Sequence, residues 1–173
     1  EPVPYNIEEL KNNTKNYKNI TIEMSAISDK DETIPFYHIK RDSIDKLKKH
    51  WASGIGSFDK NHLLSHKSKR FLISNDDIEQ ININCLTFKS LINKYSILSI
   101  EKLMLDVEGA EFRILNSINL AAIKIKEIFF EKKHFDGYLK QGEKFHIIKD
   151  KLEANNYSIK DIDEENILAS LKY

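Results

Sequence analysis

The chain has 173 residues, 27 of them basic and 27 acidic, so its formal net charge is zero. This length accommodates one domain with a hydrophobic core, and the balanced charge argues against a surface built to neutralise nucleic-acid phosphates. The apolar runs are too short to span a membrane, a single cysteine excludes an internal disulfide framework, and no secretory signal is visible, so we expect a cytoplasmic protein.

The first half of the chain combines short helices with extended segments. In chain order, we predict a helix over 5–17, strands over 20–27 and 33–39, a helix over 44–51 and a strand over 78–86. Pro35 favours an edge position for its strand, and Ser43 is a candidate N-terminal cap for the helix that follows. Residues 52–77 are mostly polar, and we expect them to form a loop-rich insertion around a helical turn.

The second half alternates strands with helices. In chain order, we predict a helix capped by Thr87, a strand over 102–106, a helix over 110–118, a strand over 126–131, a helix over 142–155, and strands over 157–162 and 166–171. This alternation indicates an α/β fold with a mostly parallel sheet. The last two strands are close in sequence and predict an antiparallel hairpin at the edge of the sheet.

Acidic residues stand where two of these strands end. The segment "LMLDVEGAEFRIL" places Asp106 and Glu108 after an apolar strand, and the later segment "KEIFFE" ends at Glu131, with His134 just beyond. In an open parallel sheet these ends face the ligand crevice, so we expect the acids to contact a substrate or cofactor. For Glu111, in the first turn of the next helix, a favourable interaction with the helix dipole is the preferred interpretation.

Several segments together resemble FkbM-type methyltransferases. "EPVPYNIEELKNN" is similar to the family's stretch after its second strand, and "SAISDKDETIPFY" to its third strand and the following hairpin. "WASGIGSF" and "CLTFKSLI" resemble segments before its fourth strand. "LMLDVEGAEFRIL" resembles the family's most recognisable motif, and "IFFEKKH" the strand after it. The resemblance covers nearly the whole chain in the right order.

This resemblance implies an S-adenosyl-L-methionine-dependent O-methyltransferase with a Rossmann-like class I sheet. In such a fold Glu1 would accept hydrogen bonds from the ribose hydroxyls of the cofactor, because one carboxylate can accept two vicinal donors. Ala26, Ile27 and Ser28 would border the adenine, and Asp106 would face the methyl group. The family's first strand and Gly-rich turn are missing, so we expect residues 1–173 to form a single, N-terminally truncated methyltransferase domain.

Methyl transfer to oxygen requires the acceptor hydroxyl to lose its proton as the methyl group arrives. His134 or Asp106 is the expected general base, and Glu108 is a further catalytic candidate. In an alternative mechanism Asp106, Glu108 and Glu131 hold a divalent cation that lowers the pKa of the hydroxyl. We favour the mechanism without a metal, because the resemblance does not require one. The expected acceptor is a sugar, a glycan precursor or a secondary metabolite.

Other patterns leave alternatives open. His62 and His66 have the spacing of a metal-binding pair on a helix, but the motif lacks the glutamate of zinc proteases, and surface histidines are the preferred interpretation. Trp51, Ser53 and Ser57 would line an acceptor pocket or anchor the loop. Two rival functions remain: a degenerate Rossmann-like domain that serves as a binding module, and another Rossmann-like enzyme that acts on nucleotide sugars.

Overall fold

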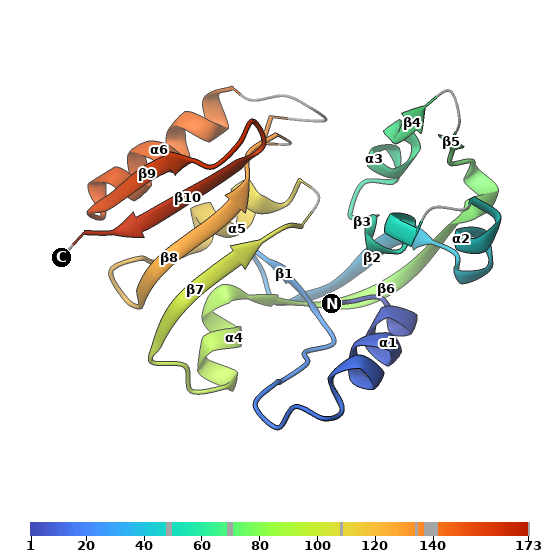
Figure 1. Ribbon diagram of the computed structural model, residues 1–173, viewed down its shortest axis with the longest axis horizontal. Coiled ribbons are helices and arrows are strands. Elements are labelled where there is room, and N and C mark those ends of the chain that lie inside the picture. Colours follow the sequence, from blue (N-terminus) through green and yellow to red (C-terminus); the bar gives the residue numbers. More distant parts are fainter. Residues whose placement is uncertain (48–49, 69–70, 108, 134, 137–141, 173) are drawn as a thin grey trace. The chain divides into compact units, whose positions relative to one another are not determined.

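A computed structural model describes residues 1–173 except 48–49, 69–70, 108, 134, 137–141 and 173. The chain divides into two compact units, Glu1–Leu86 and Thr87–Tyr173, and Figure 1 labels their helices and strands. Glu108 and His134, two predicted catalytic residues, lie outside the described residues.

The first unit contains a four-stranded sheet with the order β1-β6-β2-β3, and a two-stranded sheet of β4 and β5. Its elements are α1 (Pro4–Thr14), β1 (Ala26–Ser28), β2 (Glu32–Ile39), α2 (Arg41–Leu47), η1 (His50–Gly54), β3 (Gly56–Ser57), α3 (Lys60–Ser65), β4 (Lys67–Ser68), β5 (Phe71–Leu72), η2 (Asn75–Asp77) and β6 (Ile78–Thr87). The long β2–β6 ladder is antiparallel. Buried apolar side chains support this unit, among them Ile39, Ala52, Ile55, Leu63, Ile73 and Ile78.

Three local predictions for this unit need correction. The strand expected over 20–27 is confined to β1. Pro35 does not make β2 an edge strand, because β6 and β3 flank β2. Among the described strand pairs, β3 contacts β2 only at Tyr37 and His38, so Pro35 has a partner strand on the β6 side alone. Ser43 lies inside α2 and is buried, so it is not the cap of that helix.

The second unit contains a four-stranded sheet with the order β7-β8-β10-β9. Its elements are α4 (Phe88–Lys94), β7 (Ser99–Leu105), α5 (Glu111–Ser117), β8 (Lys124–Glu131), α6 (Glu143–Ala154), β9 (Tyr157–Asp161) and β10 (Asn166–Leu171). The pair β7–β8 is parallel, because α5 supplies the crossover that a parallel connection needs. The predicted C-terminal hairpin is confirmed: β10 is antiparallel to both β9 and β8.

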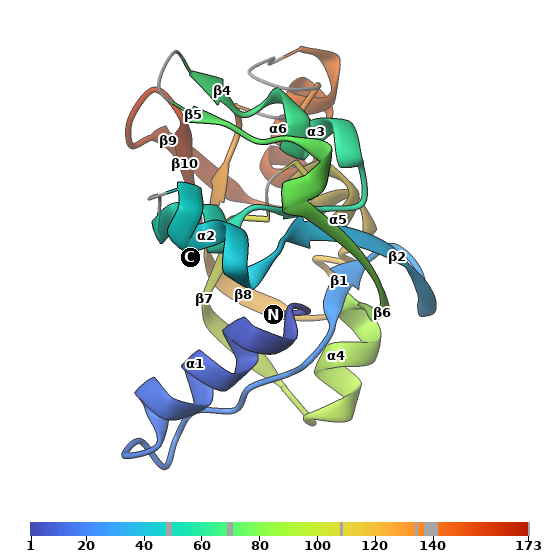
Figure 2. The same cartoon turned by 90° about the vertical axis from the view of Figure 1, so that its right-hand side faces the viewer.

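One face of this second sheet forms the core of the unit. Helices α5 and α6 lie on the same side of the sheet (Figures 1 and 2). Strand alternation directs Ile128, Phe130 and Ala169 to the buried face, while Met104 on the opposite face is 65% exposed. The hydroxyl of the buried Tyr157 donates to the carbonyl of Ile125 at 2.6 Å, which ties β9 to β8.

The fold is α/β, as predicted, but the expectation of one mostly parallel sheet is wrong for the described strand pairs. The strands form two four-stranded sheets, and the ladders β2–β6, β2–β3, β8–β10 and β9–β10 are all antiparallel. Helix–strand alternation in the sequence predicted parallel pairing. A strand can instead pair with a partner far along the chain, and the alternation does not reveal this. Within the described residues, no helix is long and apolar enough to cross a membrane.

Candidate active site

The candidate site lies in the second unit, where the parallel strands β7 and β8 end together. Leu105 is the register partner of Phe130. Asp106 directly follows Leu105, and Glu131 directly follows Phe130. The two acids therefore lie at the same edge of the sheet. The predicted meeting of Asp106 and Glu131 is therefore a direct consequence of parallel pairing in this register.

The turn between β7 and α5 brings a third acid to this edge. Gly109 has a φ of 98°, a left-handed conformation that glycine adopts without steric strain. Helix α5 then buries Ile114 and Leu115, together with Ile118 just past its end, which are three, four and seven residues after Glu111. Glu111 belongs to this same helical face, and its exposed fraction is 0%. The fold therefore directs a carboxylate into the interior.

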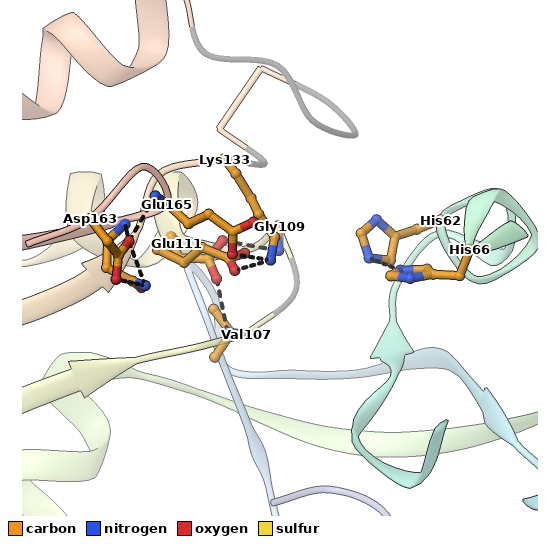
Figure 3. Close-up of polar contacts among 10 residues, drawn as sticks. His62, His66, Val107, Gly109, Glu111, Lys133, Asp163 and Glu165 are labelled. Atoms are coloured by element: carbon orange, nitrogen blue, oxygen red, sulfur yellow. Dashed lines mark hydrogen bonds and ion pairs between the residues drawn. The ribbon is translucent and has the colours of Figure 1, made fainter. Parts of the chain in front are cut away.

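Backbone groups of the turn hold the Glu111 carboxylate in place (Figure 3). Its Oε1 accepts the N–H of Val107 at 2.8 Å, and its Oε2 accepts the N–H of Gly109 at 2.9 Å. Burial nevertheless raises the pKa of Glu111 to about 7, and the nearby charge of Glu131 adds to the increase, although the backbone hydrogen bonds favour the ionised form. Glu111 thus changes its protonation state near neutral pH.

Asp106, Glu111 and Glu131 form one group of carboxylates, which we call the acid cluster. One oxygen of each lies within 4.8 Å of the others; Asp106 is exposed, and the two glutamates are buried. Three negative charges at such distances repel one another, so a proton on Glu111 stabilises the cluster. A hard divalent cation would have the same effect, because carboxylate oxygens are the ligands that Mg²⁺ prefers. The cluster is therefore suited to holding a proton or a small cation.

Lys133 supplies a positive charge beside the acid cluster. Its Nζ lies 2.5 Å from Glu131 Oε1 and 3.0 Å from Glu165 Oε2, at the end of the β9–β10 turn. Burial alone would lower the pKa of Lys133, but the hydrogen bonds and charges of these two glutamates raise it well above its ordinary range. Lys133 consequently stays charged and forms an ion pair with Glu131.

The residues predicted to contact the cofactor lie in the first unit, apart from Asp106. The amino nitrogen of Glu1 donates to the carbonyl oxygens of Glu23 at 3.2 Å and Ser25 at 3.4 Å, so Glu1 lies beside the segment that enters β1, Ala26–Ser28. One Glu1 oxygen accepts the N–H of Val3 at 2.8 Å, and the side chain is exposed. The two predicted groups, for ribose and for adenine, are therefore neighbours.

One buried atom in this region fits a ligand-binding role. The hydroxyl of Ser25, a residue 5% exposed, has no hydrogen-bond partner among the described residues. A buried hydroxyl without a partner is destabilising unless a bound group supplies one. The residues around Glu1 and β1 are thus chemically compatible with a polyhydroxylated nucleoside.

The segment predicted to form an acceptor pocket or an anchor has short regular elements of its own. Trp51, in η1, is about half exposed, whereas its neighbours Ala52 and Ile55 are buried. The carbonyl of Ser53 accepts from Asn6 at 2.9 Å, and the hydroxyl of Ser57 accepts the N–H of Asp59 at 3.2 Å. The buried side chains of Ala52 and Ile55 therefore anchor this segment, whereas the indole ring of Trp51 is accessible to solvent.

Comparison with protein-family models identifies the family. Residues 1–159 match the model described as the methyltransferase FkbM domain. The chain belongs to the FkbM methyltransferase family. Membership in this family makes the protein a methyltransferase. Neither the curated proteins nor the solved structures contain a match to the chain.

The structure of this FkbM methyltransferase adds Glu111 to the acids at this edge. Asp106 and Glu131 were predicted at one edge, and they lie there together with Glu111, for which an interaction with the helix dipole was the preferred interpretation over catalysis. A signal for Glu111 was present in the sequence. It falls three and four residues before Ile114 and Leu115, so the helical period already assigned it to the apolar face.

Proposed function

We propose that this FkbM methyltransferase uses S-adenosyl-L-methionine to methylate a hydroxyl group of a sugar, a glycan precursor or a secondary metabolite. The observation that carries the proposal is the acid cluster at the carboxyl ends of β7 and β8. An exposed carboxylate in such a group can accept a hydrogen bond from an acceptor hydroxyl and take up its proton, and Asp106 is the exposed member.

The three acids would have different roles. Asp106 is exposed and would contact the acceptor hydroxyl as a hydrogen-bond acceptor or general base. Glu131, paired with Lys133, would contribute negative potential at the site. Glu111 would act as a positioning residue, because its two hydrogen bonds to the backbone fix the turn that follows Asp106. His134 and Glu108 remain catalytic candidates on the basis of sequence.

For the cofactor we propose contacts with Glu1 and with Ala26, Ile27 and Ser28. The Glu1 carboxylate would accept the ribose hydroxyls, and Ser25, whose hydroxyl has no hydrogen-bond partner in the described part of the chain, is a further candidate in the same segment. When bound, the cofactor supplies a methyl group on a positively charged sulfur, a good electrophile. The chain then needs only to orient the acceptor oxygen and remove its proton.

The first test is binding and turnover with a panel of acceptors. Calorimetry with S-adenosyl-L-homocysteine should give a saturable isotherm that Glu1→Ala weakens. Release of S-adenosyl-L-homocysteine from S-adenosyl-L-methionine should depend on an added hydroxyl compound. Binding without acceptor-dependent turnover across sugars and small metabolites would contradict the proposed acceptor class, and absence of binding would contradict the proposed cofactor.

The second test separates chemistry from folding. Asp106→Asn keeps the size of the side chain but removes its basicity, and we expect turnover to fall by about a hundredfold or more. His134→Ala is expected to have a similar effect. Asp150→Asn, an exposed acid on α6, is the matched control and should leave turnover unchanged. Wild-type turnover in both Asp106→Asn and His134→Ala would refute the assignment of these residues.

A further inference from the structure

The first unit carries a pair of histidines whose geometry the methyltransferase function does not use. Nε2 of His62 and Nε2 of His66 lie 3.2 Å apart, and their ring centroids lie 4.9 Å apart (Figure 3). Both side chains are partly buried. The same nitrogen of each ring therefore points into one shared position.

The backbone holds this pair in place. His62 lies in α3, and His66 is the residue that terminates this helix, its N–H donating to the carbonyl of Leu63 at 3.2 Å. Leu63 is fully buried in the core of the unit. At the other end Asp59 caps the helix by accepting the N–H of Asn61 at 2.8 Å. The two imidazoles thus project from a short helix that is fixed at both ends and by its core residue.

We propose that His62 and His66 form a binding site for a divalent transition-metal ion of the zinc, copper and nickel class. Imidazole nitrogen binds Zn²⁺ at about 2.0–2.1 Å, so two such nitrogens 3.2 Å apart subtend an angle of about 100° at the metal, close to tetrahedral. Metals of this class prefer imidazole over carboxylate ligands. The site is distinct in chemistry from the acid cluster of the second unit, which suits harder cations.

Metal binding replaces the hydrogen bond that the two rings now share. In that bond one Nε2 carries a proton and the other accepts it. For both Nε2 atoms to bind the metal, a neutral donating ring must move its proton from Nε2 to Nδ1, whereas a doubly protonated ring releases its Nε2 proton to solvent. Two protein ligands leave the remaining coordination positions of the ion for water or for an oxygen or nitrogen of a small molecule.

The only tryptophan of the chain is a built-in reporter of this site. The ring of Trp51 lies 6.4 Å from the ring of His66, centroid to centroid. Titration with Cu²⁺, a quencher of indole emission, should therefore quench Trp51 with a saturable dependence on concentration. A large molar excess of Zn²⁺ should restore the emission by displacing copper, which binds imidazole sites more tightly. Calorimetry with Zn²⁺ on Trp51→Phe should still show binding, because the indole is not a ligand.

Variants of the pair decide the proposal. We expect His62→Gln and His66→Gln each to weaken the metal by about tenfold or more, because the second ligand of a pair binds intramolecularly. The double variant should bind no more tightly than either single one. His146→Gln, an exposed histidine on α6, is the control and should bind as the wild type does.

Two results would overturn the proposal. One is quenching that neither single variant weakens, and the other is quenching that falls equally in His146→Gln, which would indicate nonspecific binding to surface histidines. Circular dichroism of each variant checks that α3 and its surroundings remain folded. Methyl transfer is not needed for any of these measurements, so failure of this site would leave the proposed function unaffected.

Discussion

Two buried acids, one in each unit, show how differently a fold can treat a carboxylate. Asp77, at the end of η2 in the first unit, is 2% exposed, and Glu111 in the second unit is 0% exposed. Burial acts to raise the pKa of both groups. For Asp77 hydrogen bonds from Ser74 and Lys46 outweigh burial and hold the pKa far below its usual range, whereas for Glu111 the pKa rises to about 7.

The pKa values of Asp77 and Glu111 differ because the two carboxylates have different neighbours. Asp77 accepts the N–H and the hydroxyl of Ser74 at 2.9 and 2.6 Å and the ammonium of Lys46 at 3.0 Å, so its charge is fully compensated. Glu111 accepts two backbone N–H groups but lies beside other acids, Asp106 and Glu131. A compensated acid stabilises a fold, and an acid placed among acids indicates a functional site.

The largest expected difference between substitutions of Glu111 and of Asp77 is in the rate of turnover. Glu111→Ala should lower turnover by about a hundredfold, because the turn after Asp106 loses two hydrogen bonds and the acceptor is misplaced. Asp77→Ala should leave turnover per folded molecule nearly unchanged. Steady-state kinetics, normalised to the folded fraction, measures both variants. Equal losses in the two would mean that Glu111, like Asp77, is only structural.

For the free energy of unfolding we expect the opposite order, with a larger loss from substitution of Asp77 than from substitution of Glu111. Asp77→Ala leaves the N–H and hydroxyl of Ser74 without their acceptor, and we expect it to lower the free energy of unfolding by about 2–3 kcal/mol at pH 7. Glu111→Gln should cost less at that pH, because it removes a charge that the neighbouring acids repel. Urea denaturation of the three proteins, followed by circular dichroism, provides the comparison.

The dependence of stability on pH should have opposite signs for the two acids. The folded pKa of Glu111 lies above its usual 4.5, so its contribution is complete below that pH and is lost as pH rises through about 7. For Asp77 the folded pKa is lowered, so its contribution is present above the usual 3.8 and is lost as pH falls below it.

Urea denaturation at several pH values tests this sign. The stability of the wild type minus that of Glu111→Gln should fall by about 1–3 kcal/mol between pH 5 and pH 8. The difference between the wild type and Asp77→Asn should stay flat over this range and shrink only in strong acid. A flat difference for Glu111→Gln would mean that its carboxylate is ionised throughout.

The smallest effects are expected for the two lysine partners. Lys46 is largely exposed, and Lys46→Met should change the free energy of unfolding by less than about 1 kcal/mol. Lys133 lies against Glu131, so Lys133→Met removes the charge that balances the acid cluster and should move the pH profile of turnover to higher pH. If the pH profile of turnover in Lys133→Met equals that of the wild type, Lys133 does not influence the ionisation of the acid cluster.

Much of the secondary structure was predictable because it depends on local patterns. The helix cap at Thr87 is confirmed, with its hydroxyl accepting the N–H of Ser90 at 3.0 Å. The ends of the strands at Leu105 and Glu131 were expected within one residue, although these strands begin two or three residues earlier than predicted. Strand pairing was not predictable in the same way. Antiparallel β2–β6 joins residues that are about 40 to 50 positions apart in the sequence, and no local periodicity encodes that choice.

The sequence by itself determined which residue types stand at the strand ends: Asp106 and Glu131 follow apolar runs, and this pattern with its neighbouring segments indicated the FkbM family. Only the tertiary structure decided that Glu111 joins them and that Asp77, an equally buried acid, is compensated. The reason is physical. Which residues follow a strand is fixed by covalent order, whereas the protonation of a carboxylate depends on water exclusion and on charges that the folded chain brings from elsewhere.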